Sequence, residues 1–117
     1  MSIRRASRIA ETIRREISTM LLKQEIKDPR IGFVTITRVE VSSNLKEVEV
    51  YITYYGKDSG KNRSLEGLGS AAGFIGKEIC TRLRLRFIPS IKFLYDEKLE
   101  KTMNVLKIMD SLHSDEK

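Results

Sequence analysis

Most of the side chains that could bind a ligand in this protein are basic, and they are gathered in two segments of the sequence. Residues 1–30 hold eight Lys or Arg against four Asp or Glu, and residues 61–92 hold seven against two. The rest of the chain is net acidic, although the whole chain carries a net charge of +6. Two such segments on one face would attract a polyanion more strongly than a small substrate. RNA is therefore the expected partner, and the alternative for each segment is a solvated face that only keeps the protein soluble.

A catalytic centre is not expected from the remaining reactive residues. His113 is the only histidine and Cys80 the only cysteine. A nucleophile or general base needs a second group within hydrogen-bond reach, and a metal needs several ligands. Cys80 is expected to be a buried, reduced thiol of the core. The sequence therefore predicts no enzyme activity, no cofactor and no metal site.

The first basic segment has the pattern of an amphipathic helix over residues 3–22. Isoleucine or leucine recurs every fourth residue from Ile9 to Leu21 and forms an apolar face. At about 100° per residue, three arginines fall within an arc of about 40° on the opposite face, with Arg5 at its side. These three are Arg4, Arg8 and Arg15. Asp28-Pro29 is expected to end the helix, and Arg30 to begin the entry into a sheet.

Two β-strands are expected over residues 33–41 and 47–55, because β-branched and aromatic residues alternate with polar ones in both. Ser42-Ser43-Asn44 has the composition of the turn between them. In the first strand the alternation changes phase near Thr37 and Arg38, which predicts a β-bulge there.

A polar, flexible loop is expected over residues 56–63, and a second helix after it. Four glycines interrupt the helical pattern, each weakening it by up to about 1 kcal/mol relative to alanine. They are Gly67, Gly69, Gly73 and Gly76. Gly73-Phe74-Ile75-Gly76 matches the G-x-x-G loop that clamps a nucleic-acid backbone in KH domains. Phe74 and Ile75 are large and apolar, so a helix kink is preferred over a backbone clamp. If Gly76 lies within a helix, Gly76→Ala is expected to stabilise the fold by up to about 1 kcal/mol.

Positive charge returns at the end of this helix and in the next strand. The residues concerned are Lys77, Arg82, Arg84, Arg86 and Lys92. The strand is expected over residues 91–95, with Pro89 at its start or on an edge. Asp96 is well placed as the N-cap of a C-terminal helix whose apolar stripe reaches Leu112. Residues 113–117 are expected to form a flexible tail.

The expected order is helix, strand, strand, kinked helix, strand and C-terminal helix. This order predicts an α+β fold in which a three-stranded sheet packs on helices. A chain of 117 residues suits one domain, expected over residues 1–112. No run approaches the roughly 18 apolar residues of a membrane span, and no signal peptide is apparent, so a cytoplasmic protein is expected.

Short motifs in a fixed order cover nearly the whole chain. They are Arg8-Ile9, Arg15-Glu16-Ile17, Lys27-Asp28-Pro29-Arg30-Ile31-Gly32, Val34-Thr35-Ile36, Val39-Glu40-Val41-Ser42, Ala71-Ala72-Gly73-Phe74-Ile75 and Leu83-Arg84-Leu85-Arg86, followed by Pro89, Phe93 and Asp96. Together they make the chain similar to the ribosome-binding factor A family of bacteria, and the element order resembles a type II KH domain.

The resemblance implies a non-enzymatic, monomeric assembly factor that binds free 30S ribosomal subunits and contacts their 16S rRNA. It implies a role in late 30S maturation and 16S rRNA processing that matters most in the cold. It also implies that an Ala-x-Gly kink, here Ala71-Ala72-Gly73, replaces the KH loop. The family usually has a basic or polar residue where Gly76 stands, so Lys77 is the expected substitute for a contact there.

The RNA-binding residues expected from charge and resemblance together are Arg4, Arg5, Arg8, Arg15, Arg30, Lys77, Arg82, Arg84, Arg86 and Lys92. Tyr51 and Tyr55 could stack on bases, although tyrosines are common on half-exposed strands without any ligand. The alternative function is a protein-interaction module that uses the outer face of the sheet or the C-terminal helix and has incidental RNA affinity.

Overall fold

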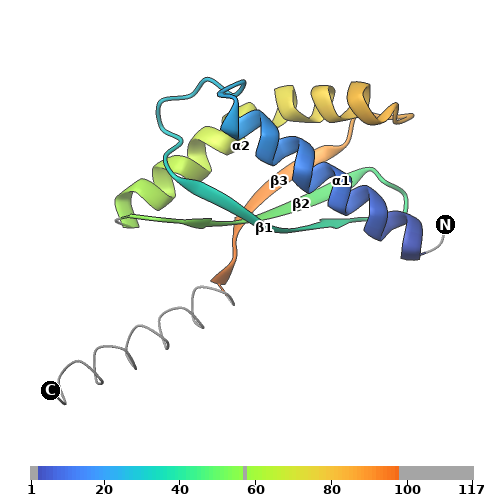
Figure 1. The fold of residues 1–117 in the computed structure, drawn as a ribbon, viewed down its shortest axis with the longest axis horizontal. Helices are drawn as coiled ribbons and strands as arrows, with labels where there is room; N and C mark the ends of the chain where they lie inside the picture. The colour runs from blue at the N-terminus through green and yellow to red at the C-terminus, as the bar shows by residue number, and fades with distance from the viewer. Residues whose placement is uncertain (1–2, 57, 98–117) are drawn as a thin grey trace, which may run out of the picture.

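A computed structural model describes residues 3–56 and 58–97 of the chain. In this part the elements follow one another as α1 (Ile3–Leu22), β1 (Val34–Val41), β2 (Glu47–Tyr54), α2 (Asp58–Leu83) and β3 (Ser90–Tyr95). The predicted α+β order is thereby confirmed up to β3 (Figure 1). The expected C-terminal helix, the tail and His113 lie outside the described residues. None of the helices in the described ranges is long and apolar enough to cross a membrane.

The sheet has the strand order β1-β2-β3. β1 and β2 are antiparallel and joined by a tight turn, whereas β2 and β3 are parallel. Parallel neighbours need a crossover connection, and α2 supplies it. Both helices lie on the same face of the sheet, with α1 packed mainly on β1 and α2 mainly on β3 (Figure 1).

The core lies between the two helices and the central strand. Ile13 and Ile17 of α1 are fully buried, as the recurrence of isoleucine or leucine at every fourth residue predicts. On β2 every second residue from Val48 to Ile52 is buried, and the residues between them lie on the open face of the sheet. The expected β-bulge is also confirmed, because the pairing of β1 with β2 shifts between Ile36 and Arg38.

The prediction of a loop over residues 56–63 is wrong for residues 58–63, because α2 begins at Asp58. The reason is a contact that local composition does not show. The ring of Tyr54, the last residue of β2, lies against the first turn of α2, where a Cβ atom on Gly60 would overlap its hydroxyl group. Gly60 therefore allows strand and helix to approach closely here, instead of marking a loop.

The G-x-x-G segment lies inside α2 and is helical throughout. Ile75 is fully buried in the core, which agrees with the preference against a backbone clamp. α2 runs as one continuous helix past Ala71, Ala72 and Gly73. Continuity of a helix does not measure a bend in its axis, and the kink expected there stays a prediction. The expected gain from Gly76→Ala is contradicted, since a Cβ atom at Gly76 would lie 2.7 Å from the carbonyl oxygen of Pro89.

Candidate nucleic-acid interface

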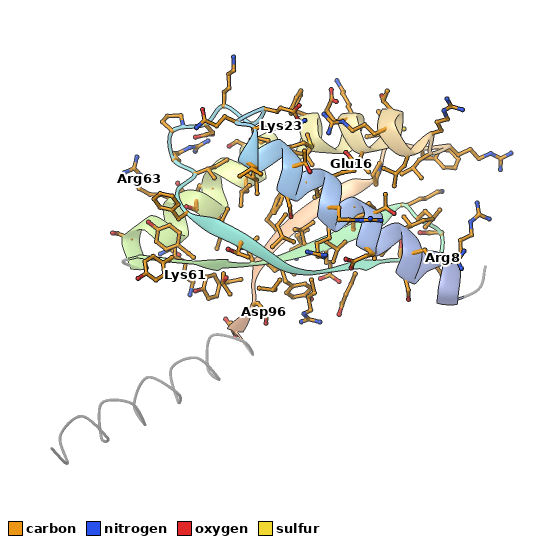
Figure 2. All side chains as sticks on the ribbon, in the orientation of Figure 1. Arg8, Glu16, Lys23, Lys61, Arg63 and Asp96 are labelled. Atoms are coloured by element: carbon orange, nitrogen blue, oxygen red, sulfur yellow. The ribbon has the colours of Figure 1, made fainter. Side chains whose placement is uncertain are left out.

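Arginines from both basic segments meet in a hollow at the end of the molecule where α1 begins and α2 ends. They are Arg5, Arg8, Arg84 and Arg86, all exposed to solvent. The turn between β1 and β2, with Asn44 and Leu45, forms another side. Figure 2 shows Arg8 at this end of α1. This surface is termed the arginine hollow, and in it two residues of each basic segment lie on one face of the protein.

The end of α2 positions two of these arginines. The amide of Arg84 donates to the carbonyl of Thr81 at 3.4 Å, and the amide of Leu85 donates to the carbonyl of Cys80 at 2.9 Å. This pair of bonds is a Schellman motif, which turns the chain sharply away from the helix axis. Arg84 occupies its left-handed position with φ of 53°, where glycine is usual and another residue costs of order 1 kcal/mol. Leu85 packs against the core, while Arg84 and Arg86 stay exposed.

Three of the four arginines of the arginine hollow keep an unneutralised charge in the described part of the protein. Among the described residues, no carboxylate forms an ion pair with the guanidinium of Arg8, Arg84 or Arg86. Several like charges around one concave surface create a positive potential that attracts anions. The arrangement can therefore hold a chain of phosphate groups.

Arg82 lies two residues before Arg84 but has a different environment. Its guanidinium is 3.1 Å from Glu16, 3.0 Å from Glu25 and 3.4 Å from Glu78. Hydrogen bonds to Glu25 and Glu16 raise the pKa of Arg82 further above its ordinary value. Figure 2 shows Glu16 midway along α1. Arg82 thus links α1 to the end of α2, and its charge is already matched by neighbouring carboxylates.

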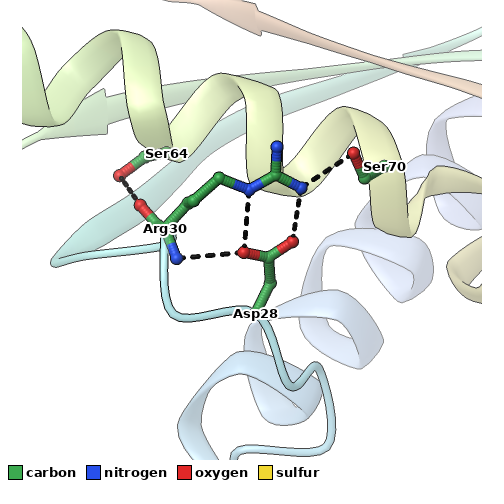
Figure 3. A network of polar contacts seen from close by, with 4 residues as sticks. All are labelled: Asp28, Arg30, Ser64 and Ser70. Carbon is green, nitrogen blue, oxygen red and sulfur yellow. Dashed lines mark hydrogen bonds and ion pairs between the residues drawn. The ribbon is translucent and has the colours of Figure 1, made fainter.

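Arg30 is likewise engaged within the protein (Figure 3). Its Nη2 and Nε atoms donate to the two carboxylate oxygens of Asp28 at 2.7 and 3.0 Å, and Nη2 also donates to Ser70 at 2.9 Å. The hydrogen bonds from Arg30 lower the pKa of Asp28 to about 2. Buried Ser64 donates to the carbonyl of Arg30 at 3.4 Å. These contacts fasten the segment before β1 to α2.

The other expected RNA-binding residues whose side chains the structure describes do not line the arginine hollow. Arg15 and Lys77 are exposed on α1 and α2, and the side chain of Arg4 is outside the described part. Lys92 alternates with two inward-facing residues of β3, so it lies on the open face of the sheet, where Glu49 is its partner in the β2–β3 register. Of the nine expected residues whose side chains are described, the structure therefore brings four together.

The sequence did not single out Phe87 as a functional residue. Phe87 lines the arginine hollow and is 55% exposed. Apolar and basic residues alternate over residues 83–87, and Phe87 falls in the same phase as Leu83 and Leu85, which pack against the core. The sequence pattern therefore suggests that Phe87 is buried and gives no sign that it is exposed. Of the two tyrosines expected to stack on bases, Tyr51 has the guanidinium of Arg38 3.8 Å from its ring centroid, and Tyr55 is 85% exposed. Neither tyrosine lines the arginine hollow, so their role stays a prediction.

Cys80 is half-buried, not fully buried as expected, and its thiol donates to the carbonyl of Leu85 at 3.5 Å. Within residues 3–56 and 58–97, no three His, Cys, Asp or Glu side chains gather closely enough to hold a metal ion.

Comparison with known proteins gives concordant results. The family model of ribosome-binding factor A matches residues 5–109. Ribosome-binding factor A of Geobacter metallireducens is 42% identical over 97% of this chain and 95% of that protein. The crystal structure of ribosome-binding factor A from Thermus thermophilus has a TM-score of 0.64 and 22% identity, over 77% of this chain and 94% of that one.

A further Thermus thermophilus ribosome binding factor A model, fitted into a cryo-electron microscopy map of its complex with the 30S subunit, has a TM-score of 0.52. It is 24% identical and covers 71% of this chain and 90% of that one. These likenesses confirm the KH-like α+β fold expected from the sequence.

Proposed function

The chain belongs to the ribosome-binding factor A family, and from this premise we propose that it is a non-enzymatic assembly factor that binds the free 30S subunit through its 16S rRNA. The observation that carries the proposal is the arginine hollow, in which Arg8, Arg84 and Arg86 have no carboxylate ion-pair partner among the described residues. It is supported by the Thermus thermophilus protein, which forms a complex with the 30S subunit. On this proposal the protein acts in the cytoplasm as a monomer, promotes late 30S maturation and 16S rRNA processing, and matters most in the cold.

Phosphate binding by side-chain charge has a measurable signature. Each phosphate contact releases about 0.7 of a counterion from single-stranded nucleic acid, so four arginine contacts predict a slope of about −3 for log affinity against log salt. A protein-interaction module with incidental RNA affinity would bind its partner with little dependence on salt.

The test compares two triple variants with equal changes in charge. In the first, Arg8, Arg84 and Arg86 of the arginine hollow are replaced by Glu. In the second, exposed basic residues elsewhere, Lys23, Lys27 and Arg63, are replaced by Glu. The hollow variant should bind purified 30S subunits about tenfold to 100-fold more weakly than the control variant, because local contacts add to the shared loss of net charge.

Equal binding by the two triple variants would place the interface elsewhere on the protein. The maturation role is tested in a deletion strain, which should accumulate immature 30S subunits and unprocessed 16S rRNA at low temperature. Normal subunit ratios and fully processed 16S rRNA in that strain would refute this part of the proposal.

A further inference from the structure

Phe87 is an aromatic side chain placed among phosphate-binding groups. It follows Arg86 directly and lines the arginine hollow with more than half of its surface open to solvent. Single exposed apolar residues are common on protein surfaces and need no explanation by themselves. An exposed aromatic ring surrounded by cations, however, combines the two elements with which proteins hold unpaired nucleic acid: charge for the backbone and a flat apolar face for a base.

The ring of Phe87 is held in a defined environment. The ammonium group of Lys46 lies 4.9 Å from the ring centroid, within the range of a cation–π contact. The amide of Ser90, at the start of β3, donates to the carbonyl of Lys46 at 2.7 Å. This bond ties the turn that carries Lys46 to the segment that follows Phe87, so the two side chains are presented together.

We propose that Phe87 is a stacking platform for one RNA base, and that the arginine hollow accordingly takes an unpaired RNA segment in preference to a duplex. The inference rests on the proposed RNA-binding function and specifies its substrate. Arg5, Arg8, Arg84 and Arg86 line the same hollow as Phe87 and bind the phosphates of the same segment. A base inside a duplex is already stacked on both faces and cannot reach the ring, whereas a base in a single strand can.

The chain contains no tryptophan, so Phe87→Trp introduces a single fluorescent reporter at the proposed platform. Stacking of a base on the indole should quench its fluorescence when a mixed-sequence single-stranded RNA is added. A blunt, fully paired duplex of the same composition should quench it much less, because its bases are stacked inside the helix. Phe33→Trp is the matched control, because Phe33 is 84% exposed and lies in a different, mainly apolar groove. Its fluorescence should change little with either RNA.

Affinity measurements by fluorescence anisotropy provide the second arm. Phe87→Ala and Phe87→Leu should each weaken single-strand binding by about 5-fold to 150-fold, the range expected for loss of one stacked base, and change binding of the blunt duplex little. Phe87→Trp should retain wild-type affinity. Phe87 is exposed, so circular dichroism melts of these variants should match the wild-type melt.

The possible results separate the stacking inference from the function on which it rests. Wild-type affinity of Phe87→Ala, or equal affinity of Phe87→Leu and wild type, would overturn stacking. If the triple variant of Arg8, Arg84 and Arg86 still loses binding in that case, the arginine hollow remains the interface. If neither set of variants loses binding, both proposals fail at this surface.

Discussion

Alanine substitutions at two glycines of α2, about one helical turn apart, should have different effects on stability. Gly73 and Gly76 both lie within the helix. A Cβ atom at Gly73 would have no other atom within 4 Å, apart from its own helix, so alanine there only gains helix propensity, worth up to about 1 kcal/mol. At Gly76 a Cβ atom would lie 2.7 Å from the carbonyl oxygen of Pro89 and 3.4 Å from a methyl group of Ile88.

The close contact at Gly76 involves a backbone atom, which cannot turn aside as a side chain can. The segment before β3 must therefore move away from α2, and overpacking of this kind costs about 1 to 3 kcal/mol. Because the gain in helix propensity is common to both variants, the difference between them isolates this cost. Gly73→Ala should thus be more stable than Gly76→Ala by about 1 to 3 kcal/mol.

Urea unfolding followed by circular dichroism measures the difference directly. Gly69→Ala is a second control, since a Cβ atom at Gly69 would also meet no neighbour within 4 Å. If Gly76→Ala proves as stable as the two control variants, the close approach of Pro89 to α2 is not a feature of the folded protein. A loss of RNA binding in Gly76→Ala would not by itself revive a backbone clamp, because displacement of Pro89 also disturbs nearby Phe87.

Two further predictions concern arginines that are paired within the protein. Arg82→Met should lower the free energy of unfolding by about 1 kcal/mol, because carboxylates of two helices lose their shared cation, and it should leave the affinity for single-stranded RNA unchanged. Arg84→Met should instead weaken RNA binding and leave the free energy of unfolding unchanged. Equal RNA affinities of the two variants would contradict the assignment. The pKa of Asp28 is about 2 in the folded protein and 3.8 ordinarily, so its stabilising contribution is complete above about pH 4 and is lost as the pH falls toward 2. Wild-type stability should therefore fall more steeply than that of Asp28→Asn between these pH values, and parallel urea midpoints across the window would exclude the effect.

Elements that depend on local periodicity could be predicted from the sequence. The spacing of isoleucines in residues 3–22 reproduces α1, and the change of phase near Thr37 reproduces the β-bulge. Residues 58–63 could not be assigned correctly, because their glycine and polar residues favour a loop and the opposing contact comes from Tyr54 on another element. Long-range packing of this kind overrides local propensity and leaves no mark in a short window of sequence.

The candidate site was predictable as a region but not residue by residue. Net charge located both basic segments, yet it could not separate Arg82, which is paired with carboxylates of two helices, from Arg84, which faces the arginine hollow. The two arginines differ in environment because α2 ends between them, at Leu83. The left-handed residue of the Schellman motif is Arg84 itself, and the sequence has no glycine there to signal it.

The fold also explains why phosphate binding should depend on side chains here and not on the main chain. A G-x-x-G loop holds phosphates with backbone amides, but residues 73–76 of this chain are helical and Ile75 points into the core. Two of the exposed cations, Arg84 and Arg86, lie instead beyond the C-terminal end of α2, after a turn closed by two main-chain hydrogen bonds. Those bonds do not involve the guanidinium groups of Arg84 and Arg86, so both side chains can be replaced while the turn persists. Loss of binding without loss of fold is therefore the behaviour expected of the arginine hollow, whereas a main-chain clamp would survive both substitutions.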